Sequence, residues 1–192
     1  MRSHKDSRRA DWAGAALPAL ALAAASAFWT VAVVQGRLQA LDEAVRSAVG
    51  AVRTSGGIRV MLAFSYLGSE YLTPLLLLAA LIVLARRARP WAVYLAASVF
   101  AANAWHIVLK QTLAVPRPDP PLFPYWQAAG YPSGHTFIGL AFAWGVLVYL
   151  NARQPWWWAG PTRRLLTALM ALWPMVVGGS RVYLDAHWAS DI

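Results

Sequence analysis

Long apolar stretches constrain this chain more than any other feature, because each is long enough to cross a lipid bilayer as a helix. A helix needs about 20 apolar residues to span a hydrocarbon core roughly 30 Å thick. Only 13% of the residues are charged, against roughly 25% in a soluble domain. We therefore predict an all-α, polytopic transmembrane bundle forming a single membrane-embedded domain over residues 1–192. The five candidate spans are residues 12–34, 61–85, 91–109, 133–150 and 165–179.

The first stretch also has features of a cleavable signal peptide. Basic residues precede it, and Ala25-Ser26-Ala27 resembles a cleavage site. Its apolar run nevertheless continues to Val34, which exceeds the 7–15 residues typical of a signal-peptide core. We therefore expect a retained span.

The segment between the first two spans, about residues 37–55, has one apolar helical face. The apolar residues on that face recur every three or four positions, and charged residues fill the rest. This pattern predicts a helix on the membrane surface, and a solvated connector helix fits it as well. The apolar residues are Leu38, Leu41, Val45, Val49 and Val52.

The chain is basic, with 17 Lys+Arg against 8 Asp+Glu and a net charge of +9. Such an excess can indicate nucleic-acid binding, but here the basic residues punctuate apolar runs. That arrangement favours membrane lipids as partners and no nucleic acid. With the N-terminus inside, ten Lys and Arg fall in inner segments and seven in outer ones. By the positive-inside rule, this bias predicts a cytoplasmic N-terminus. We expect the protein in the inner (plasma) membrane.

Three short clusters of polar residues lie at the predicted outer ends of the spans, which places them on the periplasmic or exterior side. Taken singly, each has an ordinary explanation: a lysine reaching the interface, a serine capping a helix, or a hydrogen-bonded buried histidine. The clusters are Lys110 with Arg117-Pro118, then Pro132-Ser133-Gly134-His135, then Ser180-Arg181 with His187 and Asp191.

Together the clusters contain the parts of a phosphoryl-transfer site. The transferred group needs cations around its oxygens and an in-line nucleophile. Lys110, Arg117 and Arg181 supply three cations without a metal ion or cofactor. Ser133 opens the fourth span, where free backbone amides favour an anion. Its hydroxyl and the Gly134 amide are therefore candidate phosphate ligands.

His187 and Asp191 form the candidate nucleophilic pair. Four residues separate them, so on a helix they share a face. The carboxylate can accept a hydrogen bond from one ring nitrogen and leave the other nitrogen to attack. We expect Asp185 to cap this helix. A break after Arg181 is also expected, because six residues turn a regular helix by about 240°.

The combined pattern resembles the type 2 phosphatidic acid phosphatase superfamily. The resemblance covers residues 110–191 and lies in Lys-x6-Arg-Pro, Pro-Ser-Gly-His and Ser-Arg-x5-His-x3-Asp. Three linked motifs with fixed spacing are a specific signature. The resemblance implies a six-helix membrane enzyme, so a sixth span is expected after Ile192.

The resemblance also implies roles for the motif residues. His187 would form a phosphohistidine, and His135 would protonate the leaving oxygen and later activate water. It implies that the phosphate is held by Lys110, Arg117, Ser133, Gly134, Ser180 and Arg181.

The expected activity is therefore metal-independent hydrolysis of a lipid phosphate or diphosphate. Undecaprenyl diphosphate, phosphatidylglycerophosphate, phosphatidate and lipid A phosphates all remain open as substrates. The alternatives are a lipid phosphotransferase that uses the same site, and a non-catalytic lipid-binding membrane protein. The latter would not need two histidines, Asp191 and three cations together.

Three further polar residues lie within the apolar spans. Asn103 and His106 share a helical face with Lys110. They either satisfy one another inside the bundle or line the substrate cavity, and the former is favoured. Glu70 within the second span needs a partner, either structural or at the site.

Overall fold

The computed structural model describes residues 20–69, 71–123, 129–154 and 159–192, and all regular structure in these ranges is helical. The chain divides into two compact units, Met1–Ala40 and Leu41–Ile192. The second unit contains all three motif clusters.

In the first unit, a helix covers Leu20–Val34. It ends in a turn where Gly36 has a positive φ of 67° and the Arg37 amide donates to the Ala32 carbonyl over 3.0 Å. The helix lies within the first predicted span, whose residues 12–19 fall outside the described part of the chain.

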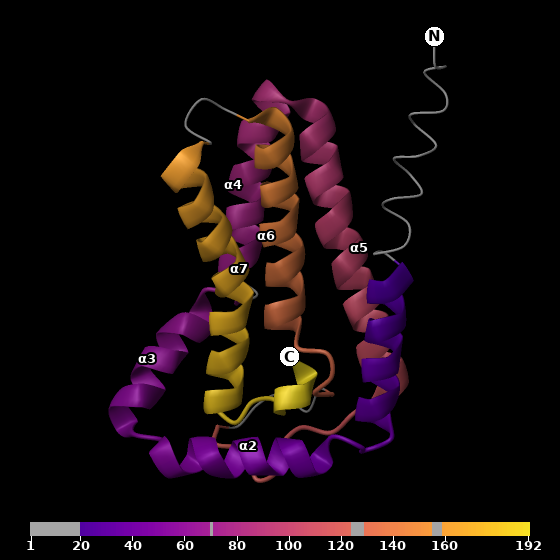
Figure 1. Ribbon diagram of the computed structural model, residues 1–192, viewed down its shortest axis with the longest axis vertical. Helices are drawn as coiled ribbons and strands as arrows, with labels where there is room; N and C mark the ends of the chain where they lie inside the picture. The colour runs from indigo at the N-terminus through magenta and orange to yellow at the C-terminus, as the bar shows by residue number, and fades with distance from the viewer. Residues whose placement is uncertain (1–19, 70, 124–128, 155–158) are drawn as a thin grey trace. The chain divides into compact units, whose positions relative to one another are not determined.

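The second unit is built on four helices: α4 (Leu72–Arg87), α5 (Arg89–Leu113), α6 (Gly134–Arg153) and α7 (Gly160–Tyr183). Pro90 near the start of α5 fits a first helical turn, where no amide hydrogen is needed. Helices α4 and α5, α5 and α6, and α6 and α7 pack against each other (Figure 1). A core formed by α4, α5 and α6 consists of Leu77, Leu84, Leu95, Val99 and Phe142.

Three helices, α5, α6 and α7, are long and apolar enough to cross a membrane within the described residues. They correspond to the third, fourth and fifth predicted spans. Their outward surfaces expose large apolar side chains, including Phe100, Trp105, Trp144 and Met175. A soluble protein rarely exposes so much apolar surface, so the all-helical transmembrane prediction is confirmed for this part of the chain.

The prediction of one continuous helix over residues 61–85 is wrong. This region forms α3 (Ser55–Tyr66) and α4, separated by a turn. Gly68 in the turn packs directly on Val177 and the His135 carbonyl, leaving no room for a side chain. The Ser69 hydroxyl then accepts from the Leu72 amide, at 3.1 Å, at the start of α4. Glu70 lies outside the described residues.

Helix α2 (Gln39–Val52) forms within the segment predicted to be amphipathic. Its buried residue is Asp42, whereas Leu41 and Val52 are exposed. A helix that buries a charged residue and exposes apolar ones favours a lipid environment for its exposed face. Its position on the membrane surface stays a prediction.

Candidate active site

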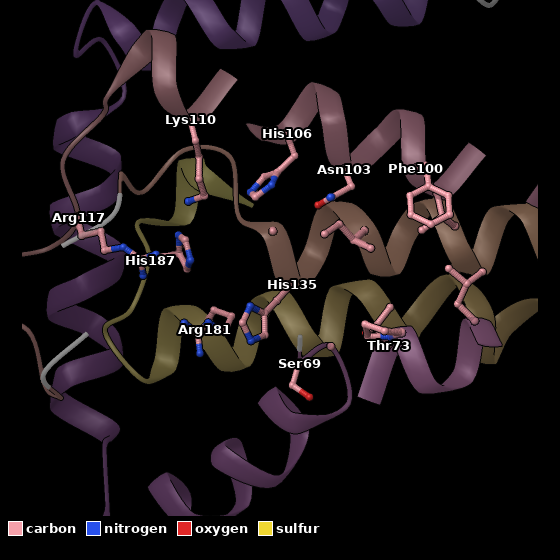
Figure 2. Close-up of a pocket in the computed structure, with 16 residues that line it drawn as sticks. Ser69, Thr73, Phe100, Asn103, His106, Lys110, Arg117, His135, Arg181 and His187 are labelled. Atoms are coloured by element: carbon pink, nitrogen blue, oxygen red, sulfur yellow. The ribbon is translucent and has the colours of Figure 1, made fainter. Parts of the chain in front are cut away.

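The three motif clusters converge on one cavity of about 420 Å³ in the second unit. Helices α4 to α7 contribute to its walls, together with the segments that follow α5 and α7 (Figure 2). Of the nine predicted site residues, six line this cavity: Lys110, Arg117, Gly134, His135, Arg181 and His187.

Lys110 and Arg117 are held by backbone carbonyls. Lys110 lies in the last turn of α5, and its Nζ donates to the carbonyls of Ala129 and, over 3.1 Å, Gly130. Arg117 lies beyond the helix, as expected, and its guanidinium donates to the Ala186 carbonyl over 2.9 Å. Neutral acceptors fix a cation in place without cancelling its charge, so both remain suited to an anion.

Arg181 lies in the last turn of α7 and is buried. Its guanidinium donates to the Ser65 hydroxyl in α3 over 3.0 Å. The end of α3, which lies in the region predicted as the second span, therefore holds the third cation, Arg181, in place. In Figure 2, Arg181 and His135 lie on the same side of the cavity.

His187 follows the expected break after Arg181, but the helix predicted from Asp185 onward is absent from the structure. Helix α7 ends at Tyr183, and Asp185 has a left-handed φ of 58° instead of capping a new helix. Only a short 3₁₀ turn, Ala189–Asp191, follows. The pair still forms, with His187 Nδ1 3.2 Å from Asp191 Oδ2.

The surroundings of this pair favour a neutral imidazole. Burial first, and then the charges of Arg117, Arg181 and Lys110, hold the pKa of His187 well below the ordinary histidine value. Burial and the three cations are therefore the main causes of the low pKa of His187.

Burial also raises the pKa of Asp191 to about 7. The Trp188 amide, which donates to Asp191 Oδ2 over 3.0 Å, opposes this rise. The charge of Asp42 adds to it. The carboxyl group that orients His187 therefore titrates close to neutral pH.

Ser133, Ser180 and Asp191 do not line the cavity. Ser133 is buried at the start of α6, and its amide donates to the Asp191 carbonyl over 2.9 Å. The Ser180 hydroxyl donates to the Val177 carbonyl one turn earlier, at 2.6 Å. Both serines therefore brace the walls of the cavity. Asp191 lies behind His187.

Helix α2 contributes site residues that sequence analysis missed. Asp42 accepts from the Ser190 amide at 2.8 Å and the Ser190 hydroxyl at 2.6 Å. Arg46 donates two hydrogen bonds of 2.9 Å to Asp185. It also donates to the carbonyls of Asp119 and Pro120 at 3.0 and 2.7 Å. The C-terminal segment that carries His187 is therefore fastened to α2.

The cavity continues from the cationic end into the helix bundle. Its far walls are apolar and include Leu77, Val99, Phe100 and Ile138. Asn103 and His106 line the cavity between the two ends, so the favoured expectation that they only satisfy one another is wrong. In the described residues, no three His, Cys, Asp or Glu side chains cluster as metal ligands would.

Comparison with known proteins finds related sequences and related folds. A family model described as the PAP2 superfamily matches residues 91–192. A Bacillus subtilis (strain 168) protein named phosphatidylglycerophosphatase B is 28% identical over 164 residues, which cover 84% of this chain and 79% of the relative.

Two solved structures share the fold. One is a transmembrane PAP2-type phosphatidylglycerolphosphate phosphatase from Bacillus subtilis, with a TM-score of 0.79 and 20% identity, covering 90% of this chain and 85% of that one. The other is Aquifex aeolicus LpxE, with a TM-score of 0.61 and 22% identity, covering 79% and 85%.

Proposed function

The chain belongs to the PAP2 superfamily, and on that premise we propose that it is an integral membrane phosphatase that hydrolyses a lipid phosphate through a phosphohistidine on His187. One observation carries the proposal. Three cations and two histidines line one end of a cavity whose other end is apolar. A phosphate fits the first end and a hydrocarbon chain fits the second.

In the first step, His187 Nε2 attacks phosphorus, because Nδ1 is occupied by Asp191. The new P–N bond forms as the bond between phosphorus and the lipid oxygen breaks. His135 donates its proton to the leaving oxygen, so that a neutral lipid alcohol departs. Lys110, Arg117 and Arg181 stabilise the charge on the equatorial oxygens, and the Gly134 amide adds a neutral donor.

In the second step, water attacks phosphorus opposite His187. His135, now without its proton, accepts one from the water as the P–N bond breaks. Inorganic phosphate and neutral His187 are the products, and the site returns to its starting state. Neither step requires a metal ion, since the three cations supply the charge.

Transfer of the phosphate to a second lipid alcohol is the nearest alternative, because the same phosphohistidine would serve. The phosphate acceptor distinguishes the two reactions.

The ten-to-seven distribution of Lys and Arg supports a site on the outer side of the inner membrane. The name of the Bacillus relative makes phosphatidylglycerophosphate the first substrate to assay.

The test is phosphate release from phosphatidylglycerophosphate in detergent micelles. We expect His187→Ala to lower kcat by about 10⁴-fold or more, because the covalent step is lost. His135→Ala should matter less for substrates with good leaving groups. Thr112→Ala, an exposed position on α5, is the control and should retain full activity. Substantial turnover by a folded His187→Ala variant would contradict the mechanism.

A further inference from the structure

Three polar side chains line the middle of the cavity and take no part in the proposed phosphate chemistry. Thr73 comes from α4, and Asn103 and His106 come from α5. Figure 2 shows Thr73 on one side of the cavity and the other two residues on the opposite side. We refer to Thr73, Asn103 and His106 as the polar band.

Two members of the polar band are buried and have polar atoms that are poorly satisfied within the described part of the chain. Thr73 is 3% exposed and His106 is 9% exposed. Within the described residues, Thr73 Oγ1 makes no hydrogen bond. The His106 ring interacts with the backbone of Pro132, but neither ring nitrogen makes a hydrogen bond of normal geometry in the same residues. Burying such atoms unpaired is unfavourable, most of all inside a membrane. Valine and phenylalanine would fill the same space without that cost, so the polar atoms are explained by a ligand.

The polar band begins directly beside the phosphate end. A Cβ added to Gly134 would lie 2.9 Å from Cε1 and Nε2 of His106, so the His106 ring packs on the backbone of the Pro-Ser-Gly-His motif. On α5, His106 and Asn103 precede Lys110 by four and seven residues. At 1.5 Å per residue, the band therefore extends about 6 to 10 Å from Lys110 along the helix.

The residues beyond the band are apolar. Val99 and Phe100 come one turn before Asn103 on α5, and Leu77 and Ile138 line the same part of the cavity. From Lys110 backwards, α5 thus presents a cation, then hydrogen-bonding groups, then hydrocarbon. A glycerol-based lipid phosphate has this order: phosphate, glycerol and ester oxygens, and acyl chains. A polyprenyl phosphate has only hydrocarbon beyond its phosphate.

We propose that the polar band binds the glycerol and ester oxygens of a glycerol-based lipid phosphate and selects such lipids over polyprenyl phosphates. The inference rests on the proposed function and specifies its substrate class. Thr73 and Asn103 can each donate and accept a hydrogen bond, and so can a neutral His106. The band therefore matches hydroxyl and carbonyl oxygens alike.

The experiment compares phosphatidate with undecaprenyl monophosphate, both as phosphate monoesters in the same mixed micelles. The readout is the ratio of their kcat/KM values. The wild-type ratio should favour phosphatidate. Thr73→Val and Asn103→Leu should each lower the ratio about five- to tenfold, because each removes a hydrogen bond that only the glycerolipid makes. His106→Phe should change it in the same direction.

Two matched variants make the readout specific. Thr73→Ser keeps the hydroxyl and should keep the ratio. Thr112→Val makes the same substitution at an exposed position of α5 and should leave the ratio unchanged. Because the Thr73 hydroxyl has no hydrogen-bond partner among the described residues, Thr73→Val should melt in detergent no lower than wild type. A clearly lower melting temperature would contradict the premise that this hydroxyl is unpaired.

Failure of the band and failure of the proposed function give different results. A wild-type protein that hydrolyses neither of these lipids nor phosphatidylglycerophosphate would contradict the proposed function. A wild-type protein that hydrolyses only the polyprenyl phosphate would overturn the polar band alone. The polar band would also be overturned if Thr73→Val and Asn103→Leu lowered the hydrolysis of phosphatidate and of undecaprenyl monophosphate by the same factor.

Discussion

At the residue scale, the proposed mechanism depends on the protonation states of His187 and Asp191. Burial and the neighbouring cations hold the pKa of His187 far below neutrality, so its ring stays neutral across the physiological range. Burial raises the pKa of Asp191 to about 7. The ionised carboxylate is the form that accepts a hydrogen bond from the Nδ1–H group of His187 and so orients the ring.

The acid limb of the pH dependence of kcat/KM should therefore report Asp191. As pH falls below about 7, Asp191 becomes protonated, and kcat/KM should decrease by up to tenfold per pH unit. Asp191→Asn accepts the same hydrogen bond at every pH, so this variant should lose that acid limb and have a lower maximum. Ionisation of the substrate phosphate affects wild type and Asp191→Asn equally, so a difference between their pH profiles comes from the enzyme. An unchanged acid limb in Asp191→Asn would assign the titration to another group.

Metal independence is a second prediction at this scale. Lys110, Arg117 and Arg181 line the phosphate end of the cavity and supply the charge that a divalent cation would otherwise provide. A chelator should leave phosphate release unchanged. Vanadate should inhibit, because it can adopt the trigonal bipyramid of the transition state. A requirement for added Mg²⁺ would contradict this assignment.

Residue spacing predicted most of the site but not all of it. The break after Arg181 followed from helical geometry, since Arg181 and His187 could not face one cavity on a single helix. The conformation at Asp185 did not follow, because its contact with Arg46 spans 139 positions and no local pattern encodes it. Ser180 belongs to a matched motif, yet its hydroxyl bonds to its own helix.

At the scale of the elements, helix α2 works as a clamp on the catalytic segment. It bonds to Ser190 through Asp42 and to Asp185 through Arg46, on either side of His187. The sequence indicated the apolar face of this helix but not the use of its polar face. Likewise, the apolar residues 61–85 gave no sign of the turn at Gly68. That turn depends on close packing of Gly68 against α7, which a local sequence pattern does not show.

Loosening this clamp should slow catalysis more than it weakens binding. Arg46→Ala removes both hydrogen bonds to Asp185, and Asp42→Asn weakens those to Ser190. Because small displacements of a nucleophile are costly, we expect kcat to fall about tenfold or more while KM changes little. Arg46→Lys keeps the charge without the paired hydrogen bonds and should be intermediate. Ser47→Ala, exposed on the same helix, is the control.

The result that contradicts the clamp is a rise in KM at constant kcat for Arg46→Ala. Such a change would mean that Arg46 binds substrate directly. Melting temperatures of the variants in detergent separate a local effect from general unfolding.

At the scale of the whole molecule, the proposed membrane orientation rests on the distribution of Lys and Arg. The native chain has no cysteine, so single cysteines can report topology. Leu122 lies exposed in the segment between α5 and α6, and Gln154 follows the other end of α6. A cysteine at position 122 should react with an impermeant thiol reagent in intact cells, and one at position 154 should not. Both should react after detergent treatment, and the reverse pattern in cells would overturn the orientation.

The most direct test of the account is whether phosphate is transferred to His187. Purified protein is mixed with radiolabelled phosphatidylglycerophosphate, quenched in alkali within milliseconds to seconds, and digested for peptide mapping. We predict an alkali-stable, acid-labile phosphate on the peptide that contains His187, in the wild type but not in His187→Ala. Label on a different residue, or full turnover with no labelled enzyme at any time point, would contradict the account.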